Sequence, residues 1–163
     1  MFTLPLPQQN SQLLGEVATA TLTRCRHAAM AFQQPVSPAH VSDYYRFVPP
    51  EREMHLVKVL GKLQCNLYRS AAEFRADFEQ LYVNVLAYHS PRCGQQAVGA
   101  IIPIAKELLE VCYEELVRQR DRLWAAEDLI KVRLGARTDA CFLPSWPCSC
   151  LNNIHAHTCQ HSF

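Results

Sequence analysis

The amino-acid sequence predicts an all-α fold, a bundle of four helices with one long loop between the first and the second. Four segments of the chain repeat apolar residues at steps of three and four, which is the spacing of one helix face. A further segment, residues 33–50, contains four prolines and therefore cannot be one regular element. The chain has 163 residues, of which 49% are hydrophobic, so it is long enough to bury a single core.

The third helix has the clearest signals, and it is expected between Ser70 and Pro91. Ser70 and Glu73 have the spacing of a capping box at its start, and Ser90-Pro91 biases the chain away from helical geometry at its end. Asn84 and His89 are polar residues late in this helix. The predicted buried face consists of Phe74, Phe78, Leu81, Val85 and Tyr88.

The first and second helices are predicted from weaker patterns. Residues 1–10 are rich in proline and glutamine and are expected to be flexible, so that Asn10 or Ser11 begins a helix ending near Phe32. Its apolar positions are Leu14, Ala18, Leu22, Cys25, Ala29 and Phe32. The second helix is short and is expected over Met54–Leu63, with Leu56, Val59, Leu60 and Leu63 pointing inward.

The fourth helix follows a short loop, and its C-terminal limit is open. Its buried positions are Ile101, Ala105, Leu108, Cys112 and Leu116, and Glu114 and Arg118 are spaced to form an ion pair. Leu116, Leu123 and Ile130 recur at intervals of seven, so the helix either runs past the core or breaks and resumes as a packing arm. We therefore expect a bundle over residues 11–123 and a helical extension over 124–137 that ends at Gly135.

Composition argues against several classes of protein. A net charge of +1 gives no reason to expect a nucleic-acid or membrane surface, and no apolar run approaches the length of a membrane span. A secretory signal is not expected, because no basic segment precedes an apolar block. The sequence also lacks a Gly-rich phosphate loop, paired carboxylates in an evident cleft and a supported Cys–His pair, so we expect neither an enzyme nor a cofactor.

The last segment, residues 138–163, is rich in cysteine and histidine, which are the ligands that zinc prefers. The spacing of these residues differs from that of paired CxxC motifs, and the segment lacks an apolar periodicity of its own. A disordered appendage is therefore the favoured interpretation, and a zinc site is the alternative. The candidate ligands are Cys148, Cys150, His155, His157 and Cys159, with Cys141 and His161 beside them.

Five short motifs occur in the loop and on the helices. In chain order they are Phe32-Gln33-Gln34-Pro35-Val36, Asp43-Tyr44-Tyr45, Met54-His55-Leu56, Asp77-Phe78, and Asn84 with Tyr88. In order and spacing they resemble a bromodomain, loosely from about Gln12 to Leu123 and without a gap from about Met54 to Pro91. The resemblance implies a left-handed four-helix bundle that binds acetylated lysine, usually on histone tails.

The resemblance also implies roles for particular residues. Phe32 and Val36 would line the acetyl pocket, Tyr44 would hold an ordered water that bridges to the acetyl carbonyl, and Tyr88 would pack at the end of the third helix. Asn84 would tie that helix to the loop, with Pro35 as a second structural residue near the pocket. An acetylated lysine is a neutral amide on an apolar stem, so an apolar slot with one or two donors suits it.

Three positions depart from the family pattern. The family places the asparagine that donates to the acetyl carbonyl directly after the tyrosine, and this chain has His89 there. Met30 and Ala31 replace a tryptophan and a proline. Pro103 lies where the fourth helix should be regular, so the rim residue is Gln95 in an ungapped reading, with Ala97 or Val98 as alternatives.

Two functions follow as hypotheses. The first is a nuclear reader module that binds an acetylated histone tail weakly or atypically, together with other proteins of a chromatin complex. The second is a degenerate bromodomain that binds a protein partner through its surface or the Leu116–Ile130 seam, without recognising acetyl-lysine. His89 argues against the first hypothesis. The retained residues of the family pattern argue against the second, namely Phe32, Pro35, Val36 and Tyr44.

Overall fold

The computed structural model of the chain describes residues 6–90 and 101–135, and every regular element within these ranges is a helix. The elements are α1 (Leu6–Arg24), α2 (Arg26–Ala31), the 3-10 turns η1 (Tyr44–Arg46) and η2 (Pro50–Arg52), α3 (Leu56–Gln64), α4 (Ala71–His89), α5 (Ile101–Arg118) and α6 (Arg120–Gly135). The predicted all-helical fold is thus confirmed.

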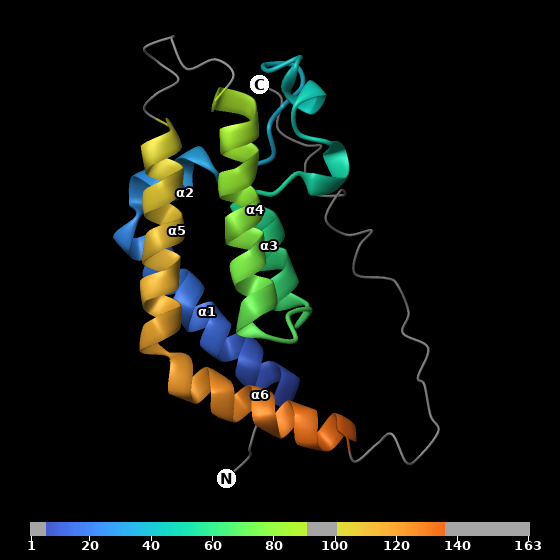
Figure 1. Ribbon diagram of the computed structural model, residues 1–163, viewed down its shortest axis with the longest axis vertical. Helices are drawn as coiled ribbons and strands as arrows, with labels where there is room; N and C mark the ends of the chain where they lie inside the picture. Colours follow the sequence, from blue (N-terminus) through green and yellow to red (C-terminus); the bar gives the residue numbers. More distant parts are fainter. Residues whose placement is uncertain (1–5, 91–100, 136–163) are drawn as a thin grey trace, which may run out of the picture.

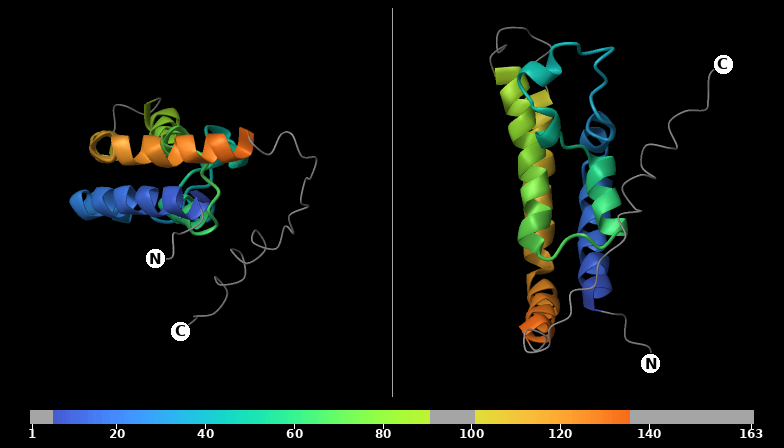
Figure 2. Two further views of the ribbon diagram at one scale, coloured as in Figure 1. Left: turned by 90° about the horizontal axis from the view of Figure 1, so that it is seen from below. Right: turned by 90° about the vertical axis from the view of Figure 1, so that its right-hand side faces the viewer.

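The long helices pack along one another, and the two ends of the bundle are covered differently. Figure 1 shows α4 and α5 side by side along the long axis, and Figure 2 shows α1 and α3 on the other side of the molecule. The loop that carries η1 and η2 lies beside the C-terminal end of α4. At the opposite end, α6 turns away from α5 and lies across the bundle against α1.

The first predicted helix differs from the observed one at its start and by an interruption, whereas its predicted end near Phe32 agrees with the end of α2 at Ala31. Its start lies at Leu6, so part of the segment expected to be flexible is helical, and the buried Asn10 donates from Nδ2 to the Tyr68 carbonyl at 3.4 Å. The helix is interrupted at Cys25, which has φ −112° and ψ 50°. The hydroxyls of Thr19, Thr21 and Thr23 each donate to the carbonyl four residues earlier, an arrangement that bends helices.

Side chains close to the N-termini of α3 and α4 cap these helices. Ser70 accepts the Glu73 N–H at 3.2 Å, as predicted, but the Glu73 carboxylate accepts the Arg69 N–H at 2.8 Å rather than that of Ser70. The second predicted helix begins at Leu56 because the His55 side chain caps it, accepting the Lys58 N–H at 3.2 Å.

The fourth helix breaks and resumes, which was one of the two predicted alternatives. The interruption lies at Gln119, and the buried Leu123 and Ala126 then hold α6 in the core. Arg122 of α6 also pairs with Glu16 of α1 at 2.9 Å. Pro103 is exposed and lies in the first turn of α5 (Ile101–Arg118), a position where a helix tolerates proline.

The predicted ion pair between Glu114 and Arg118 is wrong. Glu114 pairs with Arg24 of α1 at 2.6 Å, and Arg24 also reaches the buried Glu115 at 2.6 Å. Arg118 pairs with Glu115 at 3.1 Å instead. Two arginines therefore share one buried carboxylate, because the packing of α1 on α5 brings Arg24 within reach.

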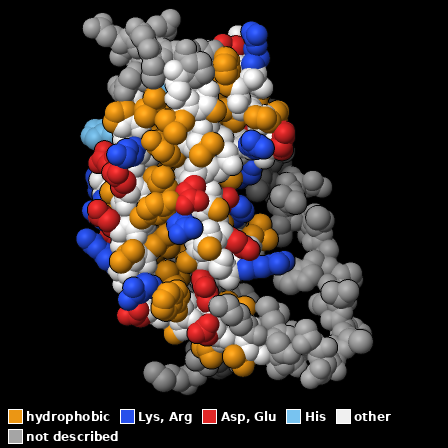
Figure 3. Space-filling model, viewed as in Figure 1, with side chains coloured by type: hydrophobic (Ala, Val, Ile, Leu, Met, Phe, Trp, Pro, Cys, Tyr) orange, Lys and Arg blue, Asp and Glu red, His pale blue; other side chains and the backbone are white. Residues whose placement is uncertain are grey.

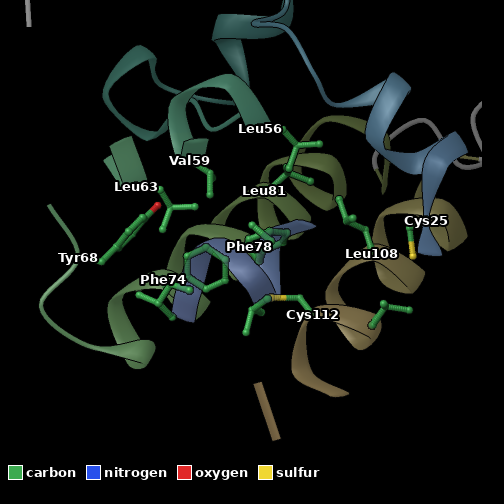
Figure 4. Packing of buried hydrophobic residues seen from close by; sticks show 14 of the residues in the cluster. Cys25, Leu56, Val59, Leu63, Tyr68, Phe74, Phe78, Leu81, Leu108 and Cys112 are labelled. Carbon is green, nitrogen blue, oxygen red and sulfur yellow. The ribbon is translucent and has the colours of Figure 1, made fainter. Parts of the chain in front are cut away.

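The core is built from the predicted apolar faces. Figure 4 shows Phe74, Phe78 and Leu81 of α4 meeting Leu56, Val59 and Leu63 of α3 and Leu108 of α5. Cys25 and Cys112 are buried free thiols in the same cluster. Burial raises the pKa of Cys112 to about 12, so this side chain stays a neutral thiol and packs as a small apolar group.

Phe78→Ala tests the importance of this core. Phe78 is 2% exposed, and we expect its truncation to lower the free energy of unfolding by about 3–5 kcal/mol in a urea titration. Val83 lies on the same helix but is 51% exposed, so Val83→Ala should change the free energy by less than about 0.5 kcal/mol. Similar losses for the two variants would contradict the packing described above.

Candidate functional site

A cavity of about 460 Å³ lies at the end of the bundle where α4 ends and the long loop folds back. Segments that are distant in the chain form it: the end of α2, the loop before α3, the last turns of α4 and the start of α5. Its lining includes six residues singled out from the sequence, namely Phe32, Val36, Tyr44, Asn84, Tyr88 and His89. The structure thus brings these side chains to one place.

Among the described residues, Pro35 is the one predicted site residue that is not part of this lining. Pro35 lies in the loop between two lining residues and is itself exposed. Gln95, with its alternatives Ala97 and Val98, lies outside the described residues, and so do the cysteine and histidine candidates for a zinc site. These predictions therefore stay predictions.

Backbone hydrogen bonds close the loop at its base. The Leu56 N–H donates to the Phe32 carbonyl at 2.9 Å, and the Val57 N–H donates to the Gln33 carbonyl at 3.1 Å. The end of the loop is thereby joined to its beginning, directly beside Phe32. Phe32 and Val36 are held at the cavity although the segment between α2 and η1 contains no regular helix.

The Glu53 carboxylate organises the interior of the loop. Oε1 accepts the Val36 N–H at 3.2 Å, and Oε2 accepts the Tyr45 hydroxyl at 3.2 Å. One side chain therefore joins the segment that carries Val36 to the segment that carries Tyr44. Without such an acceptor, the partly buried Val36 N–H would lose its hydrogen bond, which is costly away from water.

Two side chains of α4 hold the other side of the loop. The buried Asn84 donates from Nδ2 to the Arg52 carbonyl at 2.7 Å, and its Oδ1 accepts from Gln80 Nε2 at 2.7 Å. The Tyr88 hydroxyl donates to Asp43 Oδ1 at 3.0 Å. The Asn84 bond joins the helix to the loop in the way that the bromodomain resemblance implies.

Aromatic rings form one wall of the cavity. The Tyr44 and Tyr88 ring centroids are 5.3 Å apart, and the His89 ring lies edge-on to Tyr88 at 4.9 Å. Burial raises the pKa of Tyr44 to about 12, so its hydroxyl keeps a proton to donate at neutral pH. The wall is apolar on its faces and polar at its edges, as a site for a group with both characters requires.

His55 and Glu53 were not singled out as site residues from the sequence. His55 lines the cavity, and burial lowers its pKa although the nearby Glu53 carboxylate acts in the opposite direction. The imidazole is therefore neutral at pH 7. Glu53 had no local signal, because its partners Val36 and Tyr45 lie 17 and 8 residues before it in the chain.

The hydrogen bonds limit which groups can recognise a ligand inside the cavity. Both polar atoms of Asn84 are engaged with Arg52 and Gln80, and His55 Nδ1 accepts the cap bond from Lys58. The lining also contains the Tyr44 hydroxyl, the His89 imidazole and the Gln34 side-chain amide, each of which can donate a hydrogen bond. The arrangement suits a neutral, narrow group with one acceptor on an apolar stem.

Comparison with models of known protein families identifies a match. The bromodomain family model matches residues 21–94, which include every described residue of the cavity except Ile101. No curated protein matches the chain. Among the helices within residues 6–90 and 101–135, none is both long and apolar enough to cross a membrane.

Glu53→Ala tests how the loop is held. The substitution leaves the Val36 N–H and the Tyr45 hydroxyl without their acceptor, so we expect a loss of about 1–3 kcal/mol in the free energy of unfolding. Amide hydrogen exchange should also accelerate across residues 33–55. Glu51→Ala, at an exposed neighbouring glutamate, is the matched control and should leave both measurements unchanged. Unchanged exchange in Glu53→Ala would contradict the assignment.

His55 should make the free energy of unfolding depend on pH. Because burial lowers its pKa in the folded state, the unfolded chain binds the proton more readily. Its contribution to stability is complete above the ordinary histidine pKa of about 6.5 and is lost as the pH falls below that value. His55→Asn keeps a capping acceptor but cannot titrate, so urea titrations across this range should show a weaker pH dependence. Identical pH profiles would contradict the prediction.

Proposed function

Because residues 21–94 of the chain belong to the bromodomain family, we propose that the cavity binds the acylated side chain of a lysine, with an acetylated histone tail as its partner. Bromodomains are binding modules, so the family gives no reason to expect catalysis. The observation that carries the proposal is the convergence of Phe32, Val36, Tyr44, Tyr88 and His89 on one cavity of about 460 Å³.

The chemistry of the lining supports an acyl-lysine ligand. The lysine stem and the acetyl methyl need apolar contacts, which Phe32, Val36 and the ring face of Tyr88 supply. The amide carbonyl needs a donor, because burying it without one costs free energy. The protonated Tyr44 hydroxyl serves this purpose, through the bridging water that the bromodomain resemblance implies.

His89 makes the binding weak or atypical. The family's asparagine is flat and neutral and donates at every relevant pH. Neutral histidine also donates through one ring nitrogen, but the ring is bulkier, and a neighbour must fix its tautomer. If the ring does not reach the carbonyl, the binding free energy is weaker by about 1–3 kcal/mol, which corresponds to an affinity lower by about five- to 150-fold.

The second candidate function is a bromodomain that serves as a protein-interaction scaffold without reading acetyl-lysine. The absence of the family's asparagine favours it, because the substitution changes the one residue that contacts the acetyl carbonyl directly. The elaborate tethering of the loop over the cavity favours the reader. A scaffold would not need the bonds of Glu53 and Asn84 to hold the loop over an open cavity.

The wider role follows from the ligand class. An acetylated histone tail is encountered on chromatin, so we place the protein in the nucleus, as part of a complex with other chromatin proteins. Acetylated histone peptides are therefore the first ligands to test.

His89→Asn is the decisive substitution, because it restores the family's donor and changes little else. We expect the unaltered chain to bind acetylated histone peptides weakly, and His89→Asn to tighten binding by about five- to 150-fold in a calorimetric titration. The unacetylated peptide is the ligand control. Tyr44→Phe, which removes only a hydroxyl, should weaken binding in the His89→Asn background.

The same titration distinguishes the two candidate functions. If both proteins remain folded by circular dichroism and neither binds an acetylated peptide, the reader function fails and the scaffold takes its place. If the unaltered chain already binds tightly, His89 is an adequate donor, and the prediction that it weakens binding is wrong.

A further inference from the structure

A second hollow, of about 410 Å³, lies at the opposite end of the bundle from the acyl-lysine cavity. It is formed where the first turns of α4 meet the end of α5 and the beginning of α6, and we refer to it as the α4–α6 groove. Figure 3 shows hydrophobic side chains gathered on the surface in this region, with charged side chains of both signs around them. The groove shares no residue with the cavity.

The turn between α5 and α6 leaves large apolar side chains exposed in the groove. Leu123 faces the core, whereas Trp124, the next residue along α6, is 59% exposed. Val117, at the end of α5, is 67% exposed, and Tyr113 and Leu116 complete the apolar surface. Tryptophan is among the residues that contribute most to protein interfaces, so an exposed tryptophan in a hollow is suited to binding.

Two arginines flank this surface, and each lies over one of its aromatic rings. The Arg120 guanidinium is 5.3 Å from the Trp124 ring centroid, and the Arg75 guanidinium is 5.8 Å from that of Tyr113. Stacking holds each guanidinium in place while its N–H groups remain available to an acceptor. The groove therefore combines an apolar floor with two oriented cations.

The acidic groups near the groove are already engaged. Glu127, the one carboxylate in the lining, accepts the Ala71 N–H at 2.6 Å and thereby caps α4. Arg75 pairs with Glu79 at 3.2 Å and Arg120 with Asp121 at 3.3 Å, and all four of these side chains have exposed surface. The exposed pair of Arg120 with Asp121 contributes little to stability, so a carboxylate from outside can replace Asp121 at small cost. Glu79 also accepts the Tyr113 hydroxyl, so an outside carboxylate at Arg75 binds beside Glu79 and does not replace it.

We propose that the α4–α6 groove docks an acidic amphipathic segment of a partner protein. Its large apolar side chains pack on Trp124 and Val117, and its carboxylates bind the Arg75 and Arg120 guanidiniums. The charge of the lining selects this partner, because it presents two cations and a single carboxylate that is already bonded. The proposal is independent of acyl-lysine binding, since it uses none of the residues of the cavity.

A designed peptide tests the proposal on the full chain. The probe is a short fluorescein-labelled helical peptide with leucine on one face and glutamate at all other positions. The control peptide has lysine in place of every glutamate. In fluorescence anisotropy titrations, we expect the glutamate peptide to bind and the lysine peptide not to bind. Added salt should weaken the binding, because part of it is electrostatic.

Variants of the chain locate the site. Trp124→Ala should lower the affinity for the glutamate peptide by about 30-fold or more, as expected for an anchoring tryptophan. Arg75→Gln and Arg120→Gln should each lower this affinity by up to about fivefold. Leu129→Ala is the matched control, because Leu129 is also an exposed apolar residue of α6 but lies outside the groove. His89→Asn should likewise leave peptide binding unchanged.

Two results would overturn the proposal. The first is equal affinity for the glutamate and lysine peptides, or no effect of Trp124→Ala on binding while circular dichroism shows the helices intact. The second is concentration-dependent self-association in analytical ultracentrifugation that Trp124→Ala abolishes, because the occupant of the groove would then be a second copy of the chain.

Discussion

The cavity at the end of α4 depends on how the segment between Phe32 and Leu56 is held against that helix. This segment contains only two short 3-10 turns, so repetitive backbone hydrogen bonding cannot fix it. Its path is set by a few long-range bonds: the backbone pair at its base, the Glu53 carboxylate within it, and Asn84 and Tyr88 from α4. Because loops expose polar backbone groups, a loop that packs over an apolar cavity needs these acceptors and donors.

The same bonds determine what the cavity can recognise. Asn84 and His55 line it, but their polar atoms serve the architecture, since one ties down the loop and the other caps α3. In the proposed reader function, recognition of a carbonyl falls to the other polar groups of the lining, which include Tyr44, His89 and Gln34.

The helix α4 connects the two ends of the molecule. Its last turns contribute Asn84, Tyr88 and His89 to the cavity, and its first turns contribute Ala71 and Arg75 to the α4–α6 groove. Between them, Phe74 and Phe78 are anchored in the core. The cavity and the groove share no residue, so a ligand in one of them leaves the other accessible.

The sequence by itself determined those features of the fold that depend on local interactions. The buried faces of α3, α4 and α5 and the Ser70 cap follow from contacts within one or two turns, so periodicity and capping rules predict them. The likeness of the short motifs to a bromodomain then brought Phe32, Val36, Tyr44 and Asn84 together as site residues. Neither source singled out Glu53, whose carboxylate acts only after the loop has closed.

Only the tertiary structure decided the partners of the charged side chains and the course of the chain at its two breaks. Glu114 bonds Arg24 of α1 rather than its neighbour Arg118, because the packing of two helices places a better-oriented guanidinium beside it. The α5 periodicity continues past Gln119, yet the chain turns there because Leu123 and Ala126 are buried against the rest of the core. The physical reason is common to both cases: a periodic pattern shows which face is apolar, whereas the surface that covers this face lies elsewhere in the chain.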